Sequence, residues 1–124
     1  MPVFLLDSPD DPRLDPYRTL KSTTGPSQST VIAEGEKLVT RLLASRWNVQ
    51  SLVATDAMLE RLSPQIPSDL PVYLLAARQM SHLVGFAFHR GVLACAQRPQ
   101  PRSFDSMIPQ LTALPTGLVV LCPE

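Results

Sequence analysis

A strand, a glycine turn and an amphipathic helix follow one another between residues 30 and 46, and this unit constrains the fold more than any other stretch. Residues 30–33 are a short apolar run typical of a strand, and Glu34 and Gly35 interrupt it. Gly35 favours a backbone conformation that a larger residue would resist, and Glu36 follows in the first helical turn, where an acid suits the helix dipole. The next apolar residues recur with helical period and predict one buried stripe: Leu38, Val39, Leu42 and Leu43.

The same alternation of strand and helix continues along the chain. Further apolar runs predict strands at 50–55, 72–76 and 91–96, and helical patterns predict helices at 56–62 and 77–84. Asp11 followed by Pro12 predicts an earlier helix start. Strands that alternate with helices indicate an α/β fold with a largely parallel sheet and helices on both faces. We expect its core to include Leu38, Leu42, Leu52, Leu74, Leu93 and Cys95.

Composition limits the classes of function. The 124 residues suffice for one domain with a real core, and 44% hydrophobic with 18% charged residues is a globular composition. The formal net charge of zero argues against a strongly basic RNA coat protein but allows a local basic face. Cys95 and Cys122 lie in apolar runs, which favours reduced, buried thiols over a disulfide, and no zinc-ligand spacing occurs.

The apolar run at residues 3–6 is too short for a signal peptide and lacks its basic start. No run of the sequence approaches the length of a membrane span. We therefore expect a cytoplasmic protein without a membrane partner.

Three stretches, in order, carry a resemblance to a known family. They are residues 11–21, the Glu-Gly-Glu-Lys-Leu-Val segment 34–39 followed by Leu42 and Leu43, and the segment 85–99 around His89, Arg90 and Gly91. Over roughly residues 11–99 the chain resembles the N-terminal substrate-binding domain of the SpoU/TrmH family of RNA 2′-O-ribose methyltransferases. The resemblance implies a three-layer α/β sandwich with a mixed, mostly parallel four-stranded sheet, like that of kink-turn-binding ribosomal proteins.

The resemblance also implies a domain plan. Residues 1–10 would be an extended lead, 11–99 the RNA-binding domain, 100–116 a linker with a weak helix, and 117–124 the first strand of a knotted domain. In the family that knotted domain binds S-adenosylmethionine and transfers its methyl group to a ribose 2′-OH of rRNA or tRNA. We expect no cofactor and no activity in this chain alone, and a homodimer only in a full-length protein.

Nine residues are the candidate RNA contacts, and RNA is the expected partner. Arginine and lysine would bind phosphate, His89 would stack on a base or bond to a ribose, and the glycines would shape the turns. On composition alone, His89 and Arg90 would be solvated residues of a tight turn, and the resemblance is what favours RNA contact. The candidates are Arg13, Arg18, Lys21, Glu34, Gly35, Lys37, His89, Arg90 and Gly91.

Other functions compete with this interpretation. The chain could be a stand-alone RNA- or ribosome-binding module without catalysis. It could also be a small hydrolase that uses His89 or Cys95, although Cys95 lies in the middle of an apolar strand, where a reactive thiolate is disfavoured. Glu34 and Glu36 could form an acid pair, but turn and cap roles explain both.

Overall fold

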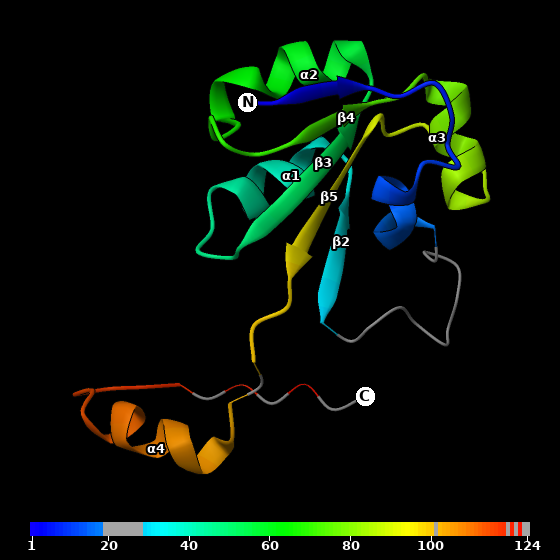
Figure 1. Cartoon of the computed structure of the whole chain (residues 1–124). Helices are drawn as coiled ribbons and strands as arrows, with labels where there is room; N and C mark the ends of the chain where they lie inside the picture. The colour runs from blue at the N-terminus through cyan, green and yellow to red at the C-terminus, as the bar shows by residue number, and fades with distance from the viewer. Residues whose placement is uncertain (19–28, 101, 119, 121, 123–124) are drawn as a thin grey trace.

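The computed structural model describes residues 1–18, 29–100, 102–118, 120 and 122. It contains one five-stranded sheet with the order β1-β4-β3-β5-β2 (Figure 1). The strands are β1 (Val3–Leu5), β2 (Thr30–Glu34), β3 (Val49–Ala54), β4 (Val72–Leu74) and β5 (Val92–Gln97). The α-helices are α1 (Glu36–Leu43), α2 (Asp56–Leu62), α3 (Ala77–Val84) and α4 (Phe104–Thr112), and two 3-10 helices are η1 (Pro12–Tyr17) and η2 (Ser63–Gln65).

Strand β5 runs against its two neighbours. It pairs antiparallel with β3 on one side and with β2 on the other, whereas β3 pairs parallel with β4 and β4 with β1. Four strands therefore end at one edge of the sheet, where β5 begins. We call this the carboxyl edge, and the opposite edge, where β5 ends, the amino edge.

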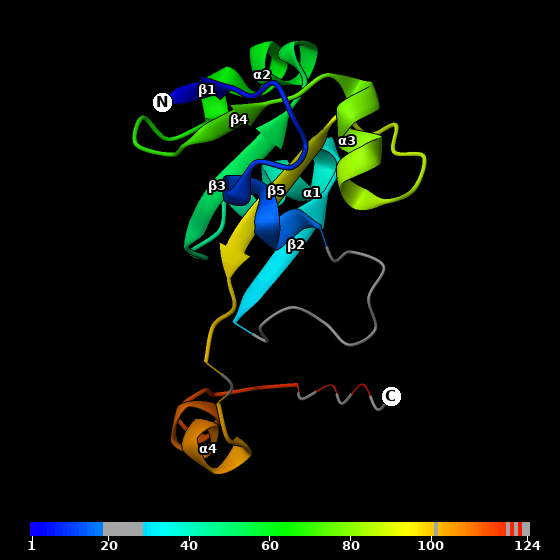
Figure 2. The ribbon, with the colours of Figure 1, turned by 45° about the vertical axis from the view of Figure 1, so that its right-hand side comes forward.

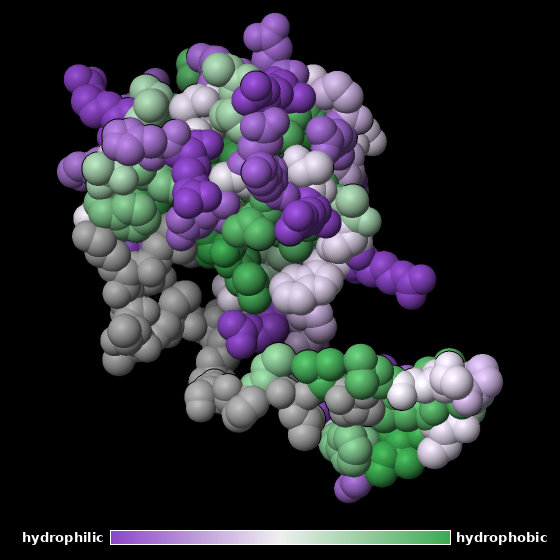
Figure 3. Space-filling model, turned by 180° about the vertical axis from the view of Figure 1, so that it is seen from behind, coloured by the Kyte–Doolittle hydropathy of each residue, from purple (hydrophilic) through white to green (hydrophobic). Residues whose placement is uncertain are grey.

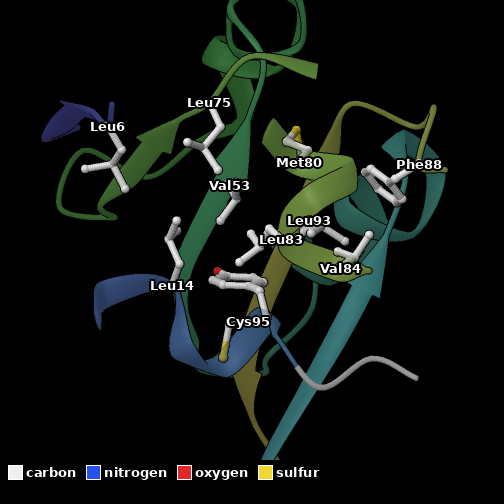
Figure 4. Close-up of a cluster of buried hydrophobic side chains, with 11 residues drawn as sticks. Leu6, Leu14, Val53, Leu75, Met80, Leu83, Val84, Phe88, Leu93 and Cys95 are labelled. Carbon is white, nitrogen blue, oxygen red and sulfur yellow. The ribbon is translucent and has the colours of Figure 1, made fainter. Parts of the chain in front are cut away.

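Helices cover both faces of the sheet and give three layers (Figure 2). On one face η1 and α3 pack over residues such as Leu93 and Cys95, and the buried Leu14, Tyr17 and Met80 fill this layer (Figure 4). On the other face the helices α1 and α2 enclose a second set of buried side chains: Val39, Leu52, Leu62, Val72, Val92 and Ala94. The alternation of side chains along β3 and β5 supplies both layers at once.

A polar pair lies inside the first layer. The Tyr17 hydroxyl and the Ser51 hydroxyl are 2.6 Å apart, joining η1 to β3. Both residues are buried, with Ser51 only 8% exposed. Burial raises the pKa of Tyr17, so the phenol stays protonated and bonded across the physiological range. This hydrogen bond helps to fix η1 on the sheet, and the Tyr17 phenol also has a backbone hydrogen bond with Cys95 of β5.

The sequence predicts most elements and misjudges several features, among them Cys122, which was expected to be buried and is exposed. The sheet has five strands rather than four, because Val3–Leu5, within the expected extended lead, pairs with β4. Leu38 is 51% exposed, because Val39 occupies the inward side of α1 and Leu38 falls on its flank. Leu42 and Leu74 are half-buried, whereas Leu52, Leu93 and Cys95 are buried as predicted.

The C-terminal segment lies apart from the sheet. Helix α4 presents hydrophobic side chains at the surface, among them Phe104 at 56% exposure (Figure 3). The described residues of the predicted strand 117–122 are Gly117, Leu118, Val120 and Cys122, and none of them is in a strand. The domain plan for residues 100–124 stays a prediction.

The Tyr17–Ser51 pair generates a stability prediction. Tyr17→Phe leaves the Ser51 hydroxyl buried without its partner and should lower the free energy of unfolding by about 1–3 kcal/mol in a urea titration. The double variant Tyr17→Phe with Ser51→Ala should lose less unfolding free energy than the two single variants together, because it leaves neither hydroxyl of the pair buried without its partner. Strictly additive losses would show that the hydrogen bond does not hold η1.

Candidate nucleic-acid interface

The carboxyl edge collects three turns that are distant in the sequence. Gly35 precedes α1, Thr55 precedes α2, and the loop 85–91 precedes β5. The Gly35 amide donates to the Val92 carbonyl at 2.9 Å, and the Thr55 amide donates to the Gly91 carbonyl at 3.0 Å. These hydrogen bonds extend the pairing of β2 and β3 with β5 past the strand ends. They hold the Glu34–Gly35 turn beside the His89–Arg90–Gly91 turn.

Gly35 and Arg90 are in close contact. Gly35 has φ 88°, in the left-handed half of backbone space that favours glycine, which confirms the conformation expected from the sequence. A methyl group at position 35 would lie 3.1 Å from the Cδ of Arg90 and 3.4 Å from its Nη1. The missing side chain thus makes room for the arginine to lie across the entrance to α1.

Gly91, at the end of the loop 85–91, also has a positive φ and no room for a side chain. It has φ 71°, and a methyl group there would lie 2.8 Å from the Cγ of Met58 on α2. Thr55, Met58, Phe88 and Arg90 line a pocket of about 260 Å³ next to this turn. That volume is below the roughly 300–1,000 Å³ of small-molecule sites. The pocket's described lining holds no carboxylate.

The charges at this edge leave two cations available. Arg90 and Lys37 are exposed, and neither enters an ion pair with another described residue. The carboxylate of Glu36 is 3.0 Å from the Arg61 guanidinium on α2 and is thereby partly neutralised. The N-cap of α1 is Gly35, and no described side chain caps the amides of the first turn. Arg90, Lys37 and these amides together offer hydrogen-bond donors to an anionic group such as phosphate.

The structure places two of the predicted contacts elsewhere. The Arg13 guanidinium binds the Asp11 carboxylate at 2.8 Å and lies over the rings of Phe4 and Tyr73, at 5.4 and 5.7 Å from their centroids. The pKa of Asp11 falls to about 2, chiefly because its carboxylate accepts hydrogen bonds from Arg13. Arg13 is therefore part of a local assembly at the β1 side of the sheet.

Arg18 has a similar structural role. It pairs with Asp15 at 2.9 Å and donates to the carbonyls of Pro9 and Asp11, which ties the two ends of η1 together. Helix η1 packs on the sheet face opposite α1. Lys21 lies outside the described residues. Of the nine candidates, the carboxyl edge brings together Glu34, Gly35, Lys37, His89, Arg90 and Gly91.

The hydrolase alternative does not fit this arrangement. Cys95 is 1% exposed in the middle of β5, and burial raises the pKa of its thiol. Its Sγ lies 3.8 Å from the Gln50 Oε1, whereas His89 is exposed in the loop before the strand. Within the described residues, no three metal-ligating side chains gather. No helix in the described part of the chain is both long and apolar enough to cross a membrane.

Sequence reasoning placed Thr55 at the end of the strand 50–55 and Met58 and Arg61 in the helix 56–62, although all three border the candidate site. Thr55 accepts from the Met58 amide at 3.4 Å as the N-cap of α2. The sequence did contain a signal for these residues, which is their position directly after the predicted strand 50–55. The turn after a parallel strand lies at the same edge of the sheet as the turns after its parallel neighbours.

No protein-family model matches the chain, but curated and solved proteins do. It is 42% identical over 102 residues to uncharacterized tRNA/rRNA methyltransferases of Mycobacterium bovis and Mycobacterium tuberculosis, covering 75% of this chain. A crystal structure of an AdoMet-bound rRNA methyltransferase from Sinorhizobium meliloti superposes with a TM-score of 0.60 at 19% identity. That match covers 80% of this chain and 38% of the solved one, and at such identity it supports the fold alone.

The chain spans about a third, 35%, of the length of the curated relatives it matches. The resemblance to RNA methyltransferases predicted from the sequence is confirmed. The partial coverage is consistent with the N-terminal domain of a SpoU-type methyltransferase.

The two cysteines provide a test of the arrangement around β5. In native protein iodoacetamide should modify the exposed Cys122 readily. It should modify Cys95 at least about tenfold more slowly, because alkylation follows thiolate fraction and access. Peptide mass spectrometry of a time course would measure both rates, with urea-unfolded protein as the control in which the two rates converge. Rapid native modification of Cys95 would contradict its place in the core.

Proposed function

We propose that this chain is the RNA-binding, substrate-recognition domain of a tRNA or rRNA 2′-O-ribose methyltransferase of the SpoU/TrmH type. The observation that carries the proposal is the contact between the Gly35 turn and Arg90 at the carboxyl edge, in a chain 42% identical to curated tRNA/rRNA methyltransferases. Two segments separated by more than fifty residues meet where both carry polar, exposed groups.

The geometry suits the backbone of a folded RNA. A guanidinium presents a planar fork of donors that matches a phosphate, and Lys37 adds a second, more flexible cation. The exposed imidazole of His89 would stack on an unpaired base or bond to a ribose hydroxyl. Glu34 and the paired Glu36 limit how many phosphates this edge can hold. The proposed recognition is therefore of RNA shape, through few contacts, as the expected likeness to kink-turn-binding ribosomal proteins also implies.

The chemistry of methylation would reside in the rest of the parent enzyme. We propose that S-adenosylmethionine is held by a knotted domain whose first strand is 117–124, and that the full-length protein forms a homodimer. In this account residues 100–116 are a linker. The RNA-binding domain reaches from the N-terminal strand to about residue 99, because β1 is part of its sheet. This chain orients the RNA and transfers no methyl group.

The first test is RNA affinity. Arg90→Glu should weaken binding to structured rRNA fragments by about tenfold or more, because it replaces a charge-assisted hydrogen bond with repulsion. The slope of log affinity against log salt should become shallower by about one unit, because one phosphate contact is lost. Fluorescence anisotropy of labelled rRNA fragments at two salt concentrations measures both quantities, starting from an affinity of roughly 10⁻⁴ to 10⁻⁶ M.

Arg78→Glu is the matched control. Arg78 is an exposed arginine on α3, on the other face of the sheet from α1, and has no ion pair among the described residues. Arg61 is less suitable, because its partner Glu36 borders the site. His89→Ala should weaken binding of structured RNA more than that of a simple polyanion. Equal binding by wild type and Arg90→Glu, or a loss confined to Arg78→Glu, would place the RNA elsewhere.

A further inference from the structure

A second set of exposed groups lies at the amino edge, far from Arg90. The turn between α1 and β3 contains Trp47, the chain's single tryptophan, which is 41% exposed. The turn is ordered by its own hydrogen bonds: the Ser45 hydroxyl donates to the Leu42 carbonyl at 2.6 Å and accepts from the Trp47 amide at 3.1 Å. The indole is thus presented at the surface on a fixed backbone.

Trp47 borders two hollows. One, of about 450 Å³, is shared with the segment that follows β5 and includes Arg46, Gln97 and Arg98. The other, of about 600 Å³, extends past Asn48 to Leu70 and includes the carboxylate of Asp69. An exposed indole that borders two hollows can be reached by a flat ligand from solvent, which a tryptophan packed into the core cannot.

The first hollow is cationic and its two walls are joined. The Gln97 amide donates to the Asn48 carbonyl at 2.9 Å, and the Asn48 side-chain amide donates to the Gln97 side chain at 3.1 Å. Arg46 and Arg98 stand on the two walls, both exposed. Neither forms an ion pair within the described ranges, and the described lining holds no acid. The hollow is therefore a surface with two uncompensated positive charges beside an aromatic ring.

We propose that this hollow is a second RNA-contact site, at which one unpaired base stacks on Trp47 while Arg46 and Arg98 hold the flanking phosphates. An aromatic platform beside cations is how proteins bind single-stranded nucleic acid without reading its sequence. The inference rests on the proposed function, because it takes RNA as the ligand. The six-residue β3 separates this site from the carboxyl edge by roughly 20 Å at about 3.3 Å per residue, so no single nucleotide reaches both.

The two sites would then bind different parts of the same RNA. The Gly35–Arg90 turn would bind the folded part of the RNA, and Trp47 would bind a single-stranded segment next to it. Such an arrangement selects RNAs in which a folded region and an unpaired region lie at the right separation. The phosphates pass over the arginine side of Trp47, because Asp69 would repel them on the other side.

The test uses tryptophan emission, which in this chain reports on Trp47 alone. An adenosine pentaribonucleotide should quench this emission in a saturable manner in wild type and equally in Arg90→Glu. Arg46→Gln with Arg98→Gln should reduce the salt slope by about 1.4, at about 0.7 for each single-strand phosphate contact. Trp47→Ala should weaken the labelled pentamer at least about fivefold by anisotropy, and Trp47→Phe should recover most of the loss. Thermal melts confirm that each variant is folded.

Each possible result either supports or overturns the second RNA-contact site. Quenching that persists in Arg90→Glu and has a shallower salt slope in the arginine double variant supports a separate site, whatever the structured RNA shows. Pentamer binding without a change in Trp47 emission overturns the proposal, while the proposed function stands or falls on structured RNA and Arg90. Quenching by polyglutamate but not by the pentamer would mean that the hollow docks an acidic protein segment, and would overturn the proposal as well.

Discussion

The reversed strand β5 is the constraint on which the rest of the structure depends. Hydrogen bonds on both of its sides join β2 to β3, and through β3 to β4 and β1. Because β5 alone runs backwards, the loop that precedes it arrives at the edge where its neighbours end. The Gly35 and Thr55 amides complete the ladder at this point. Without this reversal, Arg90 and Gly35 would lie at opposite ends of the sheet.

Local charge pairing decides which cations remain for a ligand. The guanidinium groups of Arg13 and Arg18 already bind carboxylates and carbonyls in η1 and just before it. Binding RNA through these arginines would break contacts that hold the helix. Arg90, Lys37, Arg46 and Arg98 have no such partners among the described residues. A chain of zero net charge can thus present two small cationic surfaces, one at each end of its sheet, while acidic side chains elsewhere offset them.

Local pattern predicted the elements well, and pairing between distant segments was harder to predict. The helices at 56–62 and 77–84 follow from period and caps, and the structure has both with the same bounds, while the strand expected from the apolar run 30–33 spans Thr30–Glu34. Strand Val3–Leu5 has too few residues for a pattern, and its place depends on a partner almost seventy residues away. The six candidates at the carboxyl edge were predicted from a motif resemblance. The structure places Arg13 and Arg18 away from this edge and pairs them with Asp11 and Asp15, which no sequence pattern shows in advance.

The most direct measurement is the change in backbone amide NMR signals of isotope-labelled protein when a structured rRNA fragment is added. The account predicts that the largest shifts fall on Gly35, Glu36, Lys37, Arg90 and Gly91, with those of η1 and β1 nearly unchanged. Shifts concentrated on η1 and β1, with the Gly35 and Arg90 signals unmoved by saturating RNA, would contradict the carboxyl edge as the RNA-binding surface.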